Sequence, residues 1–71
     1  MEFRVREYGR MELARLYSPD ITGDAAWRKL KKWIEICPGL IDSLKSLGYD
    51  SAQRTFTPRQ VQTIINALGE P

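Results

Sequence analysis

The sequence predicts a mainly α-helical domain, a bundle of about four helices with room for one short two-stranded sheet. Three observations lead to this prediction. The chain has 71 residues, a length that supports one hydrophobic core. Apolar residues recur at helical spacing in four segments, which are separated by proline, glycine or capping residues. With 42% hydrophobic and 28% charged residues, the composition is that of a folded globular domain, which we expect to span residues 1–71.

Two short stretches have the pattern of strands. Residues 2–6 alternate charged side chains with Phe3 and Val5, the period-2 pattern of a strand with one buried face. Residues 54–56 follow a segment without periodicity and end on Phe56. We expect the second stretch to pair with residues 3–5 and to form a small wing.

The first helix is expected over residues 10–17. Leu13, Leu16 and Tyr17 fall at helical spacing, and Glu12 stands in the first turn, where a negative charge is favoured. Pro19 ends the helix, because the residue before a proline resists the helical conformation. Residues 18–23 are then expected to form a turn.

The second helix, over residues 24–36, has the clearest amphipathic pattern. An apolar stripe predicts the face turned to the core, and it consists of Ala26, Leu30, Trp33, Ile34 and Cys37. The opposite face carries Arg28, Lys31, Lys32 and Glu35, with Lys29 and Trp27 on its two flanks. The sequence therefore predicts a basic outer face on this helix.

Two further helices complete the bundle. Pro38 fits the first position of a third helix, which Gly48 stops in the left-handed conformation. The fourth helix begins with a capping box formed by Thr57 and Gln60, with a proline at its first position. Gly69 is expected to end it.

Several classes of chemistry find no support in the composition. The chain has no histidine and a single cysteine, Cys37, and its glycines are widely separated, so histidine-based catalysis, thiolate zinc sites and phosphate-binding loops are excluded. We therefore expect no enzyme, no cofactor and no small-molecule substrate. The N-terminus lacks a secretory apolar segment, and the longest apolar run is residues 25–27, so we expect a cytoplasmic protein without a membrane partner.

The order of the elements, with the tripeptide Glu12-Leu13-Ala14 in the first helix, resembles helix-turn-helix domains of the excisionase and mercury-resistance-regulator type. In such domains the small residue lets the next helix approach, and the second helix lies in the DNA major groove. The resemblance implies a helix-turn-helix or winged-helix-like fold. It also implies that residues 27–32 form the recognition face.

The whole chain also resembles an uncharacterised family of bacterial proteins of about 70 residues, described as a domain of unknown function. That resemblance implies a fold unit without naming an activity. The residues that carry it are Tyr8, Glu12-Leu13-Ala14, Tyr17-Ser18-Pro19, Ala26, Leu30, Trp33-Ile34, Pro38, Leu44, Leu47-Gly48-Tyr49, Arg54, Phe56-Thr57-Pro58, Gln60-Val61, Ile64 and Leu68-Gly69-Pro71.

Two functions remain open at this stage. The first is a small DNA-binding accessory or regulatory protein that contacts duplex DNA through six cationic residues: Arg28, Lys29, Lys31, Lys32, Arg54 and Arg59. The second is a protein-interaction or adaptor module that binds a partner through Trp27 or self-associates as a homodimer. A net charge of +2 does not decide between DNA contacts and an ordinary solvated helix face. Neither a heptad repeat nor an obvious self-complementary face indicates a dimer.

Overall fold

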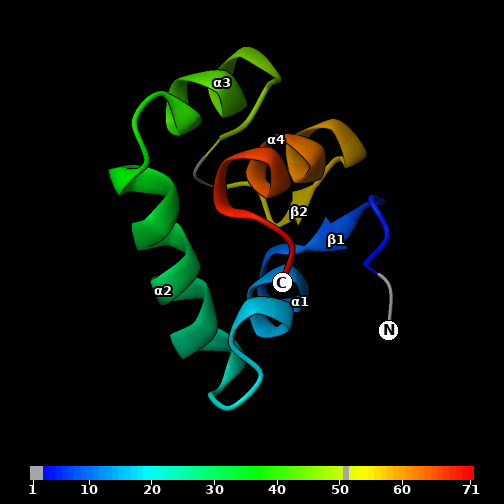
Figure 1. The fold of residues 1–71 in the computed structure, drawn as a ribbon, viewed down its shortest axis with the longest axis vertical. Coiled ribbons are helices and arrows are strands. Elements are labelled where there is room, and N and C mark those ends of the chain that lie inside the picture. The colour runs from blue at the N-terminus through cyan, green and yellow to red at the C-terminus, as the bar shows by residue number, and fades with distance from the viewer. Residues whose placement is uncertain (1–2, 51) are drawn as a thin grey trace.

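The computed structural model describes residues 3–50 and 52–71, and within these ranges it contains four helices and one two-stranded sheet. Figure 1 shows the helices surrounding the small sheet. The elements in chain order are β1 (Tyr8–Gly9), α1 (Arg10–Tyr17), α2 (Gly23–Ile36), α3 (Leu40–Ser46), β2 (Thr55–Phe56) and α4 (Pro58–Leu68). The mainly α-helical architecture with a short sheet is therefore confirmed.

The first strand lies later in the chain than predicted. β1 pairs antiparallel with β2, with Tyr8 opposite Phe56. The strand predicted over residues 2–6 does not form within residues 3–6. Glu2, at the start of that prediction, lies outside the described residues. Val5 is 42% exposed, so the alternation in this segment does not mark a buried face. Tyr8 is buried, and its hydroxyl donates to the Arg4 carbonyl at 2.8 Å.

α1 has the bounds that the sequence predicted, and α2 begins one residue earlier than expected. The Thr22 side chain caps α2 by accepting a hydrogen bond from the Ala25 N–H at 3.3 Å. In α1, Leu13 and Ala14 are fully buried, whereas Leu16 is 39% exposed. The prediction that Leu16 faces the core with Leu13 is therefore wrong.

α3 begins after a turn, so Pro38 is not its first residue as predicted. Gly39 precedes the helix with φ of 78°, a conformation that a residue without Cβ adopts readily. The Leu40 N–H closes this turn on the Cys37 carbonyl at 3.2 Å. The C-terminal prediction is confirmed, because Gly48 has φ of 88° just after the last turn.

α4 begins with the predicted capping box, and its third residue also joins three segments. The Gln60 N–H donates to the Thr57 hydroxyl at 3.3 Å, and the Gln60 side-chain oxygen accepts from the Thr57 N–H at 3.0 Å. The same oxygen accepts from the Gln53 amide at 2.6 Å, and the Gln60 amide donates to the Leu47 carbonyl at 3.3 Å. Gln60 is only 1% exposed. This buried side chain thus ties α4 to the end of α3 and to the approach to β2.

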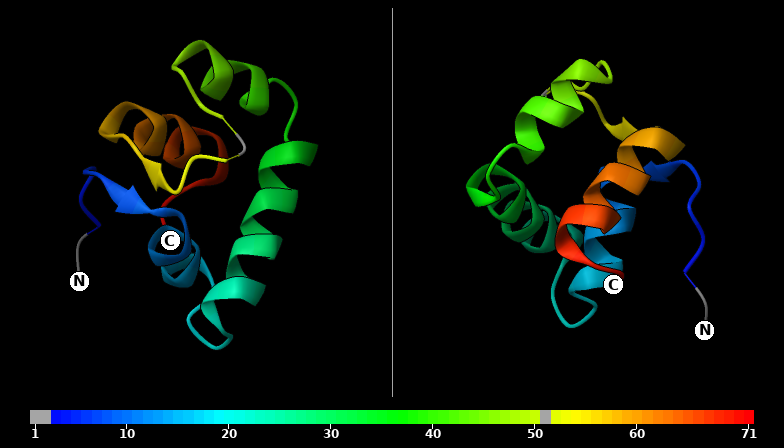
Figure 2. Two further views of the ribbon diagram at one scale, coloured as in Figure 1. Left: turned by 180° about the vertical axis from the view of Figure 1, so that it is seen from behind. Right: turned by 45° about the horizontal axis from the view of Figure 1, so that its top comes forward.

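An aromatic cluster fills the space between the sheet and the helices. The Phe56 ring stacks on Tyr49 with centroids 5.6 Å apart and meets Trp27 at 5.9 Å. Both views of Figure 2 show α2 crossing beside the sheet while α4 covers it from the other side. Because Phe56 belongs to β2 and Trp27 to α2, this cluster fixes α2 against the sheet.

Candidate nucleic-acid interface

The outward face of α2 concentrates positive charge. Residues 28–32 hold four of the eleven cationic residues of the chain. The inner face of α2 buries Ala26, Trp27, Leu30 and Ile34, which turns the opposite side of the helix toward solvent. All four cationic side chains are exposed. We refer to these four residues, Arg28, Lys29, Lys31 and Lys32, as the basic face of α2.

Few groups of the protein itself neutralise this charge. Among the described residues, the single ion pair is Arg6–Glu12, at 3.1 Å, and it lies outside α2. Lys29 makes a weaker contact, because its ammonium lies 5.2 Å from the centroid of the Trp33 ring. The other three cations of the basic face form no ion pair with the described residues. They are therefore available to an anionic partner.

Arg10 lies beside the edge of α2, although the sequence did not predict it there, and its backbone contacts that of Arg54. The Arg10 N–H donates to the Arg54 carbonyl at 2.8 Å. The Arg10 guanidinium lies 5.5 Å from the centroid of the Trp27 ring, and Lys31 follows Trp27 by one helical turn. The start of α1 thus adds one cation, Arg10, beside the Trp27 edge of α2. Arg54 lines a hollow with Gly9, Met11 and Glu12 at the start of α1. No local sequence pattern could have indicated that Arg10 lies here, because its position depends on the pairing of β1 with β2, which are far apart in the sequence.

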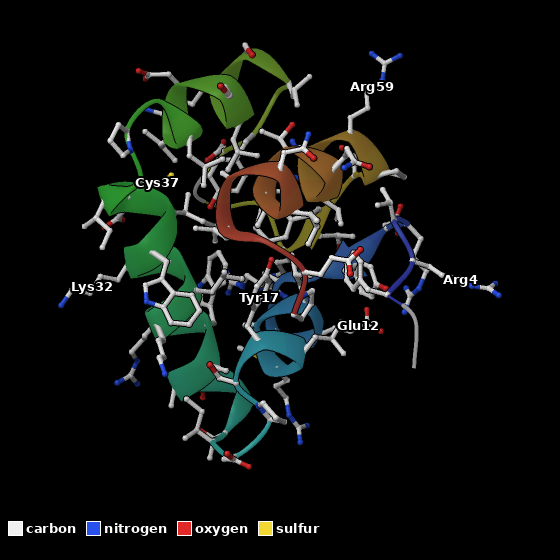
Figure 3. All side chains as sticks on the ribbon, in the orientation of Figure 1. Arg4, Glu12, Tyr17, Lys32, Cys37 and Arg59 are labelled. Atoms are coloured by element: carbon white, nitrogen blue, oxygen red, sulfur yellow. The ribbon has the colours of Figure 1, made fainter. Side chains whose placement is uncertain are left out.

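Arg59 does not join this surface. It is exposed in the first turn of α4. Figure 3 shows Arg59 and Lys32 projecting from opposite sides of the molecule. Of the six predicted DNA-contacting residues, the structure therefore groups the four on α2. Arg54 lies beside the start of α1, and Arg59 is separated from the others.

The structure buries Trp27 more deeply than the helical pattern predicted, whereas Trp33 packs against the core and is only partly buried. Trp27, expected on the flank of the helix, is only 8% exposed and packs on Phe56. Trp33, expected in the core, is partly buried and meets the edge of Tyr17 with centroids 6.1 Å apart. The reason is that β2 lies against the Trp27 side of α2 and not against the Trp33 side. The Trp27 ring therefore offers little surface for a protein partner.

The connection between α1 and α2 spans residues 18–22, which is longer than the turn of about three or four residues in a helix-turn-helix. Ala14 is fully buried beneath it. Ser18 is 8% exposed, and its hydroxyl finds no hydrogen-bond partner among the described residues. A buried hydroxyl without a partner costs free energy.

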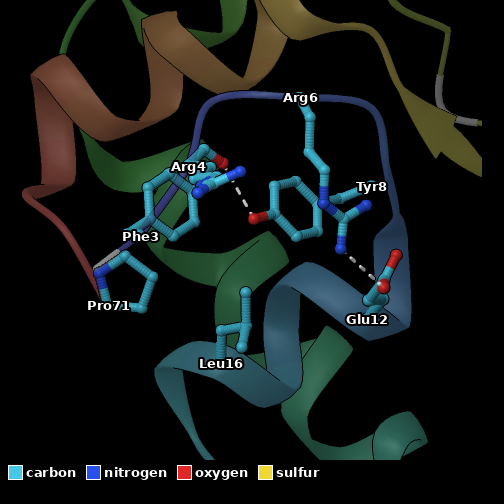
Figure 4. A pocket seen from close by; sticks show the side chains of 7 residues that line it. All are labelled: Phe3, Arg4, Arg6, Tyr8, Glu12, Leu16 and Pro71. Atoms are coloured by element: carbon cyan, nitrogen blue, oxygen red, sulfur yellow. Dashed lines mark hydrogen bonds and ion pairs between the residues drawn. The ribbon is translucent and has the colours of Figure 1, made fainter. Parts of the chain in front are cut away.

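A hollow of about 400 Å³ lies between α1, the segment before β1 and Pro71, and Figure 4 shows it from close by. The Phe3 ring stacks on Tyr8 with centroids 5.4 Å apart, and the Arg6 guanidinium lies 3.8 Å from the centroid of the Tyr8 ring. The residues that line the hollow are Phe3, Arg4, Arg6, Tyr8, Glu12, Leu16 and Pro71. Its lining is thus partly apolar, and the charged side chains of Arg6 and Glu12 pair with each other.

Two titratable side chains near α1 have shifted pKa values. The Gly9 N–H donates to the Glu12 carboxylate at 3.1 Å. This hydrogen bond and the one from Arg6 lower the pKa of Glu12. Burial, with the charge of Glu70, raises the pKa of Tyr17 to about 12. The neutral Tyr17 hydroxyl donates to the Gly69 carbonyl, and so joins the end of α1 to the end of α4.

The described residues contain no group of three cysteine, aspartate or glutamate side chains that could hold a metal ion. No helix in these ranges is long and apolar enough to cross a membrane.

Fold and surface define a class of small, mainly α-helical domain with a two-residue β-ladder and a basic helix face. Residues 4–71 match the family described as a domain of unknown function, DUF4248. The chain therefore belongs to this family, as the sequence resemblance predicted. No curated protein and no solved structure matches the chain.

Proposed function

We propose that this protein is a small accessory or regulatory protein that binds duplex DNA through the basic face of α2. One observation carries the proposal: four cationic side chains are exposed within two turns of one helix, and none forms an ion pair with the described residues. Long cationic side chains on one helix face reach phosphates on both sides of a groove. α2 has 14 residues, so it is about 21 Å long and can follow a groove over several base pairs.

One neighbouring residue supports the same surface. Arg10 lies beside the Trp27 edge of α2 and adds positive charge there. An adaptor role through Trp27 has less support, because the ring is only 8% exposed and a binding hot spot needs an accessible aromatic surface.

The test is a fluorescence-anisotropy titration of a mixed-sequence duplex at two salt concentrations. If the four cations neutralise four phosphates, affinity falls by about 100-fold between about 50 and 200 mM salt. The triple variant Arg28→Ala/Lys31→Ala/Lys32→Ala leaves one such contact, for which the same change in salt weakens binding by only about 3-fold.

A second triple variant controls for net charge. Arg4→Ala/Lys45→Ala/Arg59→Ala removes the same number of cations from exposed positions outside α2. We expect it to keep most of the wild-type affinity and salt dependence. Absence of binding at low salt, or equal loss in the two triple variants, would contradict the proposal.

A further inference from the structure

The hollow of Figure 4 brings together three parts of the chain that are far apart in the sequence. Phe3 belongs to the segment before β1, Leu16 to α1 and Pro71 to the segment after α4. The volume of about 400 Å³ lies within the range of about 300 to 1,000 Å³ that is usual for small-molecule sites. The four residues of the basic face of α2 do not line the hollow, so it is separate from that surface.

Apolar groups form most of the walls of this hollow. Figure 4 shows the Phe3 and Tyr8 rings on one side, Leu16 on the opposite side and Pro71 at one end. Tyr8 is buried, whereas Phe3, Leu16 and Pro71 keep exposed surface. A flat apolar group between the Phe3 ring and Leu16 would remove this surface from water.

Contacts within the protein hold the aromatic wall in place. The Phe3 and Tyr8 rings are nearly parallel, with an angle of 14° between their planes. The Tyr8 hydroxyl donates to the Arg4 carbonyl at 2.8 Å, and the Arg6 guanidinium lies 3.8 Å from the centroid of the Tyr8 ring. Because the wall is already formed, less conformational entropy is lost when a ligand binds.

Two of the three charged side chains in the lining neutralise each other. Arg6 pairs with Glu12 at 3.1 Å, and the Glu12 carboxylate also accepts from the Gly9 N–H at 3.1 Å. Arg4 is exposed beside Phe3 and forms no ion pair with the described residues. The charge that remains available at the hollow is therefore a guanidinium, which binds carboxylates through two parallel hydrogen bonds.

We propose that this hollow binds a small aromatic carboxylate, a molecule of one or two fused rings that carries one carboxylate group. The ring lies between Phe3 and Leu16, and the carboxylate pairs with Arg4 at the rim. An aromatic ring suits the site better than an aliphatic chain, because the edges of aromatic rings interact favourably with a neighbouring ring such as that of Phe3. This inference goes beyond DNA binding and does not rest on it.

Titration of the full chain with naphthoate, followed by two-dimensional amide NMR, tests the site. We expect a Kd of about 0.1 to 1 mM, because a ligand with so few atoms gains limited affinity. The amides of the segment before β1 and of Leu16 should shift most. Absence of saturable shifts up to about 10 mM naphthoate, or shifts centred on the basic face of α2, would overturn the proposal.

Two related compounds test which part of the ligand is recognised. Naphthamide keeps the fused rings without the charge, and cyclohexanecarboxylate keeps the charge without an aromatic ring. Each should bind more weakly than naphthoate by about 3-fold or more. Equal affinity for naphthoate and either compound would contradict the assignment of the site to aromatic carboxylates.

Two variants test the protein side, and a third serves as a matched control. Arg4→Gln should weaken naphthoate binding by about 5-fold, and Leu16→Gln, which makes the opposite wall polar, by about 3-fold or more. Arg59→Gln removes the same charge from an exposed position that does not line the hollow and should bind like the wild type. Circular dichroism confirms that each variant is folded. Equal affinity of Arg4→Gln and Arg59→Gln, or wild-type affinity of Leu16→Gln, would overturn the proposal.

Discussion

Replacing Gln60 with leucine should destabilise the fold more than any surface change on α4. The Gln60 side chain makes three hydrogen bonds, to the Thr57 N–H, the Gln53 amide and the Leu47 carbonyl. At about 1 kcal/mol for each bond, their loss costs about 3 kcal/mol. Burial of the leucine side chain returns about 1 kcal/mol, so we expect a net loss of about 2 kcal/mol.

This loss is a large part of the stability of the domain. A chain of 71 residues is expected to have a free energy of unfolding of about 4 to 11 kcal/mol. Urea denaturation followed by circular dichroism measures the change. With a denaturant slope of about 1 kcal/mol/M, the midpoint of Gln60→Leu should fall by about 2 M.

Gln62 provides the matched control on the same helix. It is exposed, and among the described residues its side chain hydrogen-bonds only Asn66, one turn further along, at 2.9 Å. Gln62→Leu should therefore change the free energy of unfolding by less than about 0.5 kcal/mol. Equal midpoints for the two variants would refute the argument that Gln60 ties three segments together.

Three further substitutions test other features of the fold. Ser18→Ala removes a buried hydroxyl without a partner among the described residues, so urea denaturation should show unchanged stability or a gain of about 0.5 to 1 kcal/mol. Gly48→Ala adds a Cβ at a residue whose φ is 88°. The substitution should lower the free energy of unfolding by about 1 to 2 kcal/mol, and thermal denaturation should show a midpoint lower by several degrees. The raised pKa of Tyr17 means that the folded state favours the neutral phenol, so this contribution is present below pH 10 and is lost as pH rises toward about 12. The shift corresponds at most to about 3 kcal/mol, and to about 1 kcal/mol after discounting for a half-exposed ring. Urea titrations below pH 10 and near pH 12 should show a smaller decline in Tyr17→Phe than in the wild type.

Local sequence signals predicted the helices well. The bounds of α1 and the start of α4 match the prediction, because Pro19 and the Thr57 capping box act within one helical turn. The start of α3 was less predictable, since a proline can open a helix or stand in the turn before it. Here Gly39 forms that turn.

Long-range packing decided what the sequence left open. The helical pattern identified the exposed cations of α2, but it could not show which tryptophan would meet Phe56. The pairing of β1 with β2 likewise joins Tyr8 to Phe56, far along the chain, and nothing near Tyr8 in the sequence indicates this partner. For the same reason Arg10 was not recognised as a neighbour of the basic face.

The two-residue ladder also has a consequence for how the chain folds. Tyr8 and Gly9 pair with Phe56 and Thr55, so residues 8–56, about two thirds of the chain, form a closed loop whose ends are the two strands. The contacts within and between neighbouring helices form at short sequence separation, whereas the ladder must overcome the entropy of closing this loop. Closure of the ladder is therefore expected to be the slow step, and the amides of β1 and β2 should be the last to gain protection from hydrogen exchange during refolding.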